Sequence, residues 1–393
     1  TRYLGECGGN ILALEGSFRR ASITRSRTRD LENVSVICEN FDQFNINKKF
    51  DLITLIGVFE YSNLYMQSKD SHFEMLQKVK KMLKPGGKLI IAIENQIGLK
   101  YFAGAAEDHI GKVMYGIENR YKNNQVKTFG RVVIEKLLKS AEFSNINFLA
   151  PYPDYKLPIS IVTEFGFSSS AFNASNLASE SVNHDPQMPK DNYFSMELAY
   201  KVLFSNNLGI DIANSFLIVA SSQSNKSIDS KILAYHYSTD RFEQYCKESK
   251  FIEENNKINV IYKSLNTKAN YDDSSKIVFN LPKSANYVYG NSLANKFFQI
   301  LQKNNWDYLE VAIFMKSYLE ILNKFDDYPT FYEDKINLKN KIPGKFFDCI
   351  PQNLIQNNKG TYTIIDEEWT YKSDIEQGYL IFRSLINLIN NEN

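Results

Sequence analysis

The sequence has no excess of charge of either sign. Lysine and arginine number 46 against 45 aspartates and glutamates, which gives a formal net charge of +1. Without a basic surplus, the chain as a whole has no strong electrostatic attraction to nucleic acid or to anionic lipid. We therefore expect no nucleic-acid partner.

Cysteines are few and far apart. The chain has four, at Cys7, Cys38, Cys246 and Cys349, and none stands in a C-x-x-C spacing. Neither a zinc site nor a disulfide framework is therefore predicted. Isolated thiols are typical of a reducing compartment, so we expect a cytoplasmic protein.

Long hydrophobic runs are also missing. No stretch approaches the roughly 18 apolar residues that a membrane span needs, and no basic-then-apolar signal region opens the chain. The sequence predicts a soluble protein without a transmembrane segment, although it can still associate peripherally with a membrane. The first residues, TRYLGECGG, resemble the end of a helix, so we expect further chain before Thr1.

Strands and helices alternate over about the first hundred residues. The hydrophobic pattern predicts strands at 10–14, 34–38, 50–56 and 88–93, and helices at 19–29 and 73–83. Pro85 and the two glycines after it stop the second helix. Such alternation with short connections predicts right-handed crossovers and a parallel sheet. At 393 residues, the chain should contain two or three domains.

Four segments of this region carry a family resemblance: LEGS, VICENF, FDLITLIGVFEY and MLKPGGKLIIAIEN. In this order they resemble the second to fifth strand motifs of class I methyltransferases that depend on S-adenosylmethionine. The resemblance implies a Rossmann-like α/β domain over residues 1–165. The glycine-rich first motif and the first strand are not in the chain, so the domain looks N-terminally truncated. We therefore expect unpaired edges on strands 10–14 and 50–56, and poor cofactor binding by the 393-residue chain.

The resemblance implies a cofactor site at the ends of three strands. Its residues would be Glu15, Gly16, Asn40, Phe41, Gly57 and Val58. Glu15 would accept hydrogen bonds from the two ribose hydroxyls, as an acidic residue does in dinucleotide folds. Asn40 and Phe41 would lie against the adenine, and Gly57 and Val58 would face the methyl-bearing sulfonium.

Residues 93–121, followed by TFGR and PYPDYKLP, resemble methyltransferases of bacterial cell-surface polysaccharide assembly. Segments inserted after the fifth strand lie at the carboxyl edge of the sheet, where open α/β folds bind ligands. The resemblance implies an acceptor site for a glycan, a lipid-linked saccharide or its phosphorylated terminus.

Several residues of this insertion are candidates for work on the acceptor. His109, between acidic neighbours, is the catalytic candidate: it could act as a base or orient an anionic acceptor, or it could be a structural histidine. Arg120 or Arg131 could pair with a phosphate. Thr128 is predicted to cap a helix over 132–141 that buries Val133.

The second half has a different pattern. Residues 166–192 are rich in serine, asparagine and proline and predict a linker or surface excursion, which places the second domain at 193–393. After a helix at 193–207, antiparallel strands are predicted at 215–220, 232–237 and 258–262, and helices at 292–303 and 306–322. A small sheet followed by helices is the layout of a two-lobed kinase.

Four residues extend this kinase-like interpretation. Lys263 ends the strand VIYK, while Asp348 and Asn353 in FFDCIPQN have the spacing of a kinase catalytic loop, and Asp366 follows in IIDEEW. The motifs resemble the aminoglycoside-phosphotransferase branch of kinases. In that family Lys263 would bind the ATP phosphates, Asp348 would face the acceptor hydroxyl, and Asn353 and Asp366 would hold Mg²⁺. A degenerate kinase-like module or an unrelated α+β domain remains the alternative.

Three hypotheses for the whole chain follow. The first is a bifunctional enzyme similar to the methyltransferase-kinases that cap O-antigen chains. The second is a methyltransferase whose C-terminal half is a binding or scaffolding module for glycosyltransferase partners. The third, which applies if the first motif is truly absent, is a structural partner without catalysis.

Overall fold

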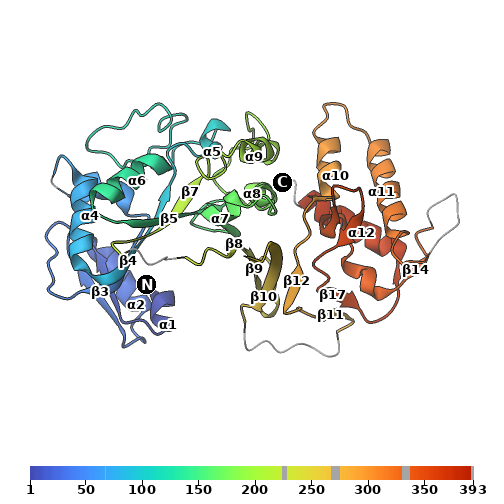
Figure 1. Ribbon diagram of the computed structural model, residues 1–393, viewed down its shortest axis with the longest axis horizontal. Helices are drawn as coiled ribbons and strands as arrows, with labels where there is room; N and C mark the ends of the chain where they lie inside the picture. Colours follow the sequence, from blue (N-terminus) through green and yellow to red (C-terminus); the bar gives the residue numbers. More distant parts are fainter. Residues whose placement is uncertain (67, 224–227, 267–274, 330–336, 391–393) are drawn as a thin grey trace. The chain divides into compact units, whose positions relative to one another are not determined.

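The secondary structure divides between two units, each assembled from separate parts of the chain (Figure 1). The computed structural model describes residues 1–66, 68–223, 228–266, 275–329 and 337–390. Unit 1 comprises Thr1–Phe102, Ala106–Phe148 and Asn214–Ser227, and unit 2 comprises Ala103–Ala105, Leu149–Ala213 and Ile228–Asn393. The division therefore differs from the predicted domains 1–165 and 193–393.

Unit 1 contains two pairs of parallel strands, each pair joined through a helix. After α1 (Arg2–Glu6), β1 (Ile11–Glu15) pairs with β2 (Val34–Cys38) across α2 (Phe18–Arg27), and β3 (Phe50–Ile56) pairs with β4 (Leu83–Glu94) across α4 (Ser71–Met82). The helical spacing predicted for α4 is confirmed, because Met75, Leu76 and Val79 are fully buried. The alternation of strand and helix gives unit 1 its Rossmann-like character.

Strands β1 and β3 are both edge strands of their sheets. Among the described residues, β1 pairs with β2 alone and β3 pairs with β4 alone, as expected for these two strands. On β3, Leu52 and Ile56 have exposed fractions of 42% and 49%. These apolar side chains are far more exposed than those of the inner strand β4, where Leu89 and Ile91 are fully buried.

A strand from much later in the sequence completes the sheet of unit 1. β7 (Ser215–Ser221) runs antiparallel to β4, and β5 (Asn145–Tyr152) lies on its other side, so the order is β3-β4-β7-β5. The sequence pattern predicted β7 as the first strand of the second domain. Its apolar residues are instead buried in unit 1, and the antiparallel direction makes the sheet mixed rather than all parallel.

Helix α6 (Arg131–Ser140) begins two residues later than a cap at Thr128 would allow. Its N-cap is Gly130, whereas the Thr128 hydroxyl lies 2.7 Å from the Tyr121 hydroxyl. Ile134, Leu138 and Ala141 are buried while Val133 is 46% exposed, so the prediction that the helix buries Val133 is wrong and Ile134 takes that place in the buried face. Figure 1 shows α6 beside α4, and the two helices are in contact.

The predicted linker at 166–192 is largely helical in unit 2. It contains most of α7 (Glu164–Ser168), all of α8 (Ala174–Ser181) and η2 (Val182–His184), and α9 (Met196–Ser205) follows. Helix α8 packs against α9 and buries Leu177 and Ala178 together with Ser181. The serine hydroxyl donates to a backbone carbonyl at 2.8 Å, so a serine-rich segment can form a buried helix face.

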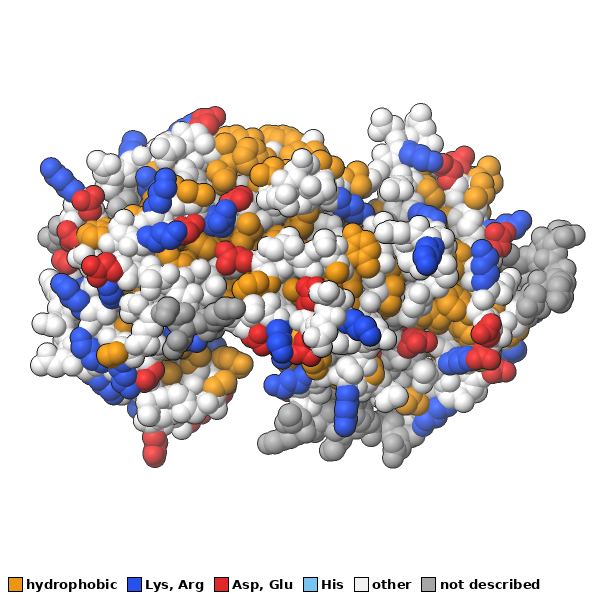
Figure 2. All heavy atoms as spheres, in the orientation of Figure 1, with side chains coloured by type: hydrophobic (Ala, Val, Ile, Leu, Met, Phe, Trp, Pro, Cys, Tyr) orange, Lys and Arg blue, Asp and Glu red, His pale blue; other side chains and the backbone are white. Residues whose placement is uncertain are grey.

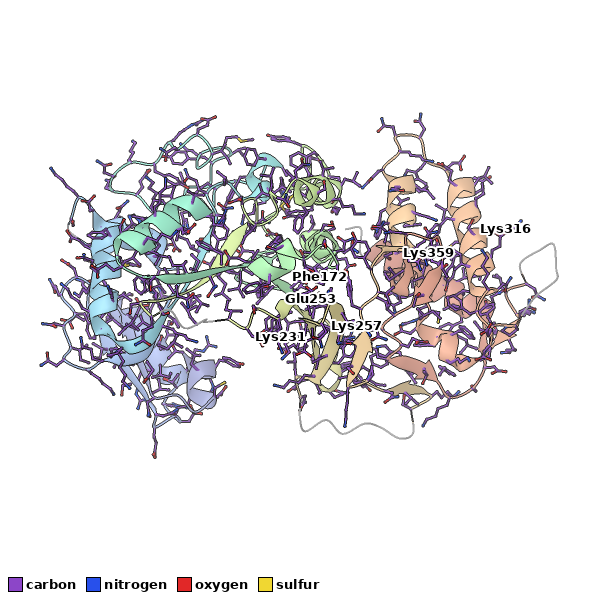
Figure 3. All side chains as sticks on the ribbon, in the orientation of Figure 1. Phe172, Lys231, Glu253, Lys257, Lys316 and Lys359 are labelled. Carbon is purple, nitrogen blue, oxygen red and sulfur yellow. The ribbon has the colours of Figure 1, made fainter. Side chains whose placement is uncertain are left out.

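The sheet of unit 2 is antiparallel throughout. The later residues of β5 are followed in order by β6 (Ser160–Thr163), β8 (Ile232–Ser238), β9 (Lys247–Glu254), β10 (Lys257–Ser264) and β12 (Ser284–Asn286). In Figure 3, Lys231 marks the start of β8, and Glu253 and Lys257 mark the hairpin between β9 and β10. The backbone nitrogen of Glu253 donates to the carbonyl of Lys231 at 2.8 Å. β9 was not predicted because five of its eight residues are charged.

The rest of unit 2 is built around three helices: α10 (Ala294–Leu301), α11 (Tyr308–Leu322) and α12 (Gln377–Asn390). Tyr318, Leu322, Leu354 and Leu380 are fully buried in their shared core. Short strands complete it: β11 (Ile277–Phe279), β13 (Asn291–Ser292), β14 (Lys341–Ile342), β15 (Leu354–Gln356), β16 (Tyr362–Ile364), β17 (Trp369–Tyr371) and β18 (Ile375–Glu376).

The surface agrees with the charge balance of the sequence. On the face shown in Figure 2, lysine and arginine side chains lie among aspartates and glutamates rather than in a field of one sign. Within the described part of the chain, no helix is both long and apolar enough to cross a membrane.

Candidate active site

Unit 1 brings two acidic side chains together where its central parallel strands end. After β3 the chain turns through Gly57, with φ +61°, into the short helix η1 (Phe59–Tyr61), which carries Glu60. Glu94 is the last residue of β4. Because adjacent parallel strands end at the same edge of a sheet, both carboxylates reach one place.

His109 completes a cluster with these two glutamates. One ligand atom from each of Glu60, Glu94 and His109 lies within 4.8 Å of the other two. Both glutamates are fully buried. His109 Nε2 lies 3.5 Å from Glu94 Oε2, and His109 Nδ1 lies 3.2 Å from the Tyr61 hydroxyl. We refer to Glu60, Glu94 and His109 as the edge cluster.

The acidic neighbours of His109 fix the loop that carries it. A carboxylate oxygen of Glu107 accepts hydrogen bonds from the backbone nitrogens of His109 and Ile110, at 2.9 and 2.6 Å. Asp108 pairs with the fully buried Lys100 at 3.3 Å and accepts a hydrogen bond from the Tyr101 hydroxyl. Glu107 and Asp108 therefore have structural partners and position His109.

The surroundings of His109 favour its protonated form. Burial alone would lower the pKa of the imidazole, but the Glu94 carboxylate and the charges of Glu107 and Glu60 outweigh it, so the pKa is raised. The sequence reasoning identified His109 but missed both glutamates of the edge cluster. The available signal was a glutamate at or just after the end of each of two apolar strands.

The residues assigned to the cofactor lie at the ends of β1, β2 and β3. Glu15 Oε1 accepts hydrogen bonds from the Ser17 nitrogen and from Arg20 Nε, both at 2.9 Å. Burial would raise the pKa of this carboxyl, but the bonds from Arg20 and the backbone lower it, so Glu15 is ionised. A Cβ on Gly16 would lie 3.5 Å from Asn40 Oδ1, which brings Asn40 beside the Glu15 turn.

Phe41, Gly57 and Val58 complete this set. Lys78 Nζ lies 5.2 Å from the centre of the Phe41 ring and donates to the Phe41 carbonyl at 2.7 Å. Gly57 and Val58 stand between β3 and Glu60, so the residues predicted to face the methyl group are neighbours of the edge cluster in the chain. The Gly57 nitrogen donates to the Ala92 carbonyl at 3.0 Å.

Residues 1–91 match the family model described as a methyltransferase domain. Over residues 1–91, all of which lie in unit 1, the chain is thus similar to a methyltransferase domain. The match includes every residue assigned to the cofactor and ends shortly before Glu94 and His109. No match to the chain is found among curated proteins.

Several solved structures are similar to the chain. The N-methyltransferase NodS from Bradyrhizobium japonicum, in complex with S-adenosyl-L-homocysteine, is 16% identical, with 36% of this chain and 58% of NodS covered and a TM-score of 0.26. A possible histamine N-methyltransferase from Thermotoga maritima is 13% identical, with 54% and 72% covered and a TM-score of 0.30. The chain thus spans less than two thirds of the length of NodS.

Each of the two arginines predicted to pair with a phosphate has a glutamate neighbour. Arg120 pairs with Glu118 at the surface. Arg131 Nη1 lies 3.9 Å from a Glu135 carboxylate oxygen one turn along α6.

In unit 2 the structure changes which lysine belongs with Asp366. Lys263 is exposed and lies on the face of β10 opposite to Tyr262, whose ring is 5.1 Å from Lys247 Nζ. Lys247, 1% exposed, pairs with Asp366 and, at 2.6 Å, with Glu368. The prediction that Lys263 lies across from Asp366 is therefore not met, because side chains alternate faces along a strand.

The other three predicted residues lie close together in unit 2. Asn353 Nδ2 donates to the Asp348 carbonyl at 2.9 Å, and the nitrogen of Ile365, next to Asp366, donates to the Asn353 carbonyl at 2.8 Å. Asp348 is 4% exposed and pairs with Arg383 at 2.7 Å. Burial raises the pKa of Asp348 to about 6 in spite of that arginine. These residues converge, but their charges are already paired with lysine and arginine.

Proposed function

We propose that the chain is an S-adenosylmethionine-dependent methyltransferase. The observation that carries the proposal is the match of residues 1–91 to a methyltransferase domain, together with an ionised glutamate at the end of β1. A parallel strand that ends in a carboxylate is the arrangement that binds a ribose diol in Rossmann-like folds.

The proposed cofactor site follows the carboxyl ends of three strands. Glu15 would accept from the ribose hydroxyls, and Gly16 would leave room for the sugar because it has no side chain. Asn40 and Phe41 would contact the adenine through an amide and an aromatic ring. Gly57 and Val58 would face the sulfonium, whose methyl group would then lie on the side of the edge cluster. The residues present fit the cofactor, since Glu15 is ionised and Asn40 is exposed beside it.

The proposed acceptor is an oxygen of a bacterial cell-surface glycan or of its phosphorylated terminus. The acceptor oxygen would attack the methyl carbon, a carbon–oxygen bond would form as the carbon–sulfur bond breaks, and S-adenosylhomocysteine would leave. The proton of a hydroxyl acceptor would pass to solvent, whereas an ionised phosphate oxygen has no proton to lose. Of the two catalytic roles predicted for His109, the arrangement favours orientation of the acceptor. Both ring nitrogens already have polar neighbours, Glu94 at one and Tyr61 at the other.

A second candidate activity belongs to unit 2. Asp348, Asn353 and Asp366 converge beside a buried lysine, which supports an ATP-dependent phosphotransferase. Asn353 and Asp366 would hold Mg²⁺, but the ion would have to share Asp366 with Lys247. If the ion cannot do so, the unit is the degenerate binding or scaffolding module for a glycosyltransferase partner.

Isothermal titration calorimetry of the full-length protein tests the two activities separately. We expect binding of S-adenosylmethionine and of S-adenosylhomocysteine, with transfer of a labelled methyl group to a glycan extract. No binding of either cofactor would overturn the methyltransferase proposal. Binding of ATP that requires Mg²⁺ would support the phosphotransferase. No binding of ATP, with or without Mg²⁺, would support the scaffolding module instead.

A further inference from the structure

We propose that the edge cluster of Glu60, Glu94 and His109 binds a divalent cation of the Mn²⁺ type, which in turn binds an oxygen of the methyl acceptor. The cation site does not depend on the proposed function. The part that concerns the acceptor rests on the proposed function.

Charge is the first reason. Glu60 and Glu94 are both fully buried, and their carboxylates lie within the same cluster. Two buried carboxylates at one place repel each other when both are ionised, and a divalent cation between them would relieve that repulsion.

The set of donor atoms is the second reason. Each residue offers one ligand atom, and the three atoms lie within 4.8 Å of one another. Ligands around one ion at about 2.0–2.3 Å lie up to about 4.5 Å apart, so small side-chain shifts would place all three on one ion. Two carboxylates and one imidazole suit Mn²⁺, which accepts both oxygen and nitrogen ligands.

The orientation of the imidazole is an independent observation. His109 has a side chain only 12% exposed, and its Nε2 is buried and aimed at Glu94 over 3.5 Å, longer than an ordinary hydrogen bond. Its other nitrogen is held by the Tyr61 hydroxyl, and its backbone is held by Glu107. A second partner on the far nitrogen is what fixes the ring of a metal-binding histidine.

The place of the cluster gives the cation its task. Glu60 follows Gly57 and Val58 by two residues, and these are the residues proposed to face the sulfonium. A cation held there would bind a hydroxyl or phosphate oxygen of the acceptor beside the methyl group. The segment with His109 would thus select acceptors that offer an oxygen able to coordinate a metal ion.

Titration of the full-length protein with Mn²⁺ alone tests the site, with free Mn²⁺ measured by electron paramagnetic resonance. We expect one saturable site, with affinity at least tenfold weaker in Glu94→Gln and in Glu60→Gln. Glu118→Gln is the matched control, because Glu118 is a half-exposed glutamate of the same insertion that pairs with Arg120. Its affinity for Mn²⁺ should equal that of the unmodified protein.

A second measurement uses the unmodified protein and needs no variant. Diethylpyrocarbonate modifies accessible imidazole nitrogens, and mass spectrometry reports each histidine separately. We expect Mn²⁺ to slow modification of His109 at least fivefold while the exposed His184 is modified at an unchanged rate. Equal rates at His109 with and without Mn²⁺ would overturn the site.

The outcomes separate this inference from the proposed function. Calorimetric binding of S-adenosylmethionine without saturable binding of Mn²⁺, Mg²⁺ or Zn²⁺ would overturn the cation site and leave the methyltransferase proposal standing. Mn²⁺ binding that is unchanged in both glutamine variants would overturn the site as well. Mn²⁺ binding that is weakened in both variants, without any cofactor binding, would support the site and contradict the methyltransferase proposal.

Discussion

Replacing Lys247 by methionine should destabilise unit 2 strongly, whereas the same change at Lys263 should not. Lys247 is 1% exposed, and its ammonium pairs with Asp366 and with Glu368, which is 2% exposed. Removing one partner of a buried ion pair costs about 3–5 kcal/mol, since the other charge is left in a poorly hydrated site.

The expected loss lies at the lower end of that range. Arg241 still pairs with Glu368 after the substitution, and Asp366 has a side chain that is 33% exposed and can be hydrated. We therefore expect a loss of about 3 kcal/mol in the free energy of unfolding. With a urea dependence of about 1–3 kcal/mol per molar, the midpoint should fall by about 1–3 M.

Tryptophan fluorescence reports this unit alone. The chain has two tryptophans, Trp306 and Trp369, and both belong to unit 2. Trp369 Nε1 donates to Glu368 Oε1 at 3.2 Å, so its emission senses the cluster directly. Lys263→Met, at an exposed position, should change the free energy of unfolding by less than about 0.5 kcal/mol and leave the urea midpoint nearly unchanged. Equal midpoints for the two variants would refute the reasoning.

Three further predictions concern unit 1. In the full-length protein, Glu15→Gln should weaken S-adenosylhomocysteine binding about 10- to 100-fold in calorimetry, through loss of about 1.5–3 kcal/mol of charge-assisted hydrogen bonding, whereas Glu32→Gln should not. Burial, with repulsion from a lysine, lowers the pKa of His72 to about 4, so stability present above pH 6.5 should be lost as pH falls toward 4, by up to about 3 kcal/mol. His72→Phe should remove that loss in urea titrations at each pH. Ile134→Ala should cost about 2–5 kcal/mol in thermal unfolding, and Val133→Ala less than about 0.5.

The fold of unit 1 was predictable where local pattern and tertiary structure agree. Strands at Val34–Cys38 and Phe50–Ile56 are as predicted, because apolar runs bounded by polar turns have few alternatives. The place of β7 was not predictable from local pattern, since an apolar strand does not encode which sheet it joins. The helix α8 was missed because its buried face consists of alanines and serines together with one leucine.

The candidate site was predictable only in part for a similar reason. Glu15 and His109 belong to segments whose resemblance could be recognised, and the structure places each at a strand end or in the insertion beside one. Glu60 and Glu94 were missed because a glutamate at or after a strand end is usually exposed, and the local pattern does not show that these two are buried beside His109. Lys247 was missed because its strand is rich in charged residues, a composition typical of a surface segment.

The late position of β7 has a consequence for how unit 1 is made. β7 lies between β4 and β5, yet the ribosome synthesises it only after Leu149–Ala213, which belong to unit 2. Until then β4 and β5 each lack their inner neighbour, so the nascent domain has an open gap in its sheet. A gene truncated after residue 165 should therefore yield an aggregating product, and a cut placed after Ser221 is the earliest that retains β3, β4, β5 and β7 together.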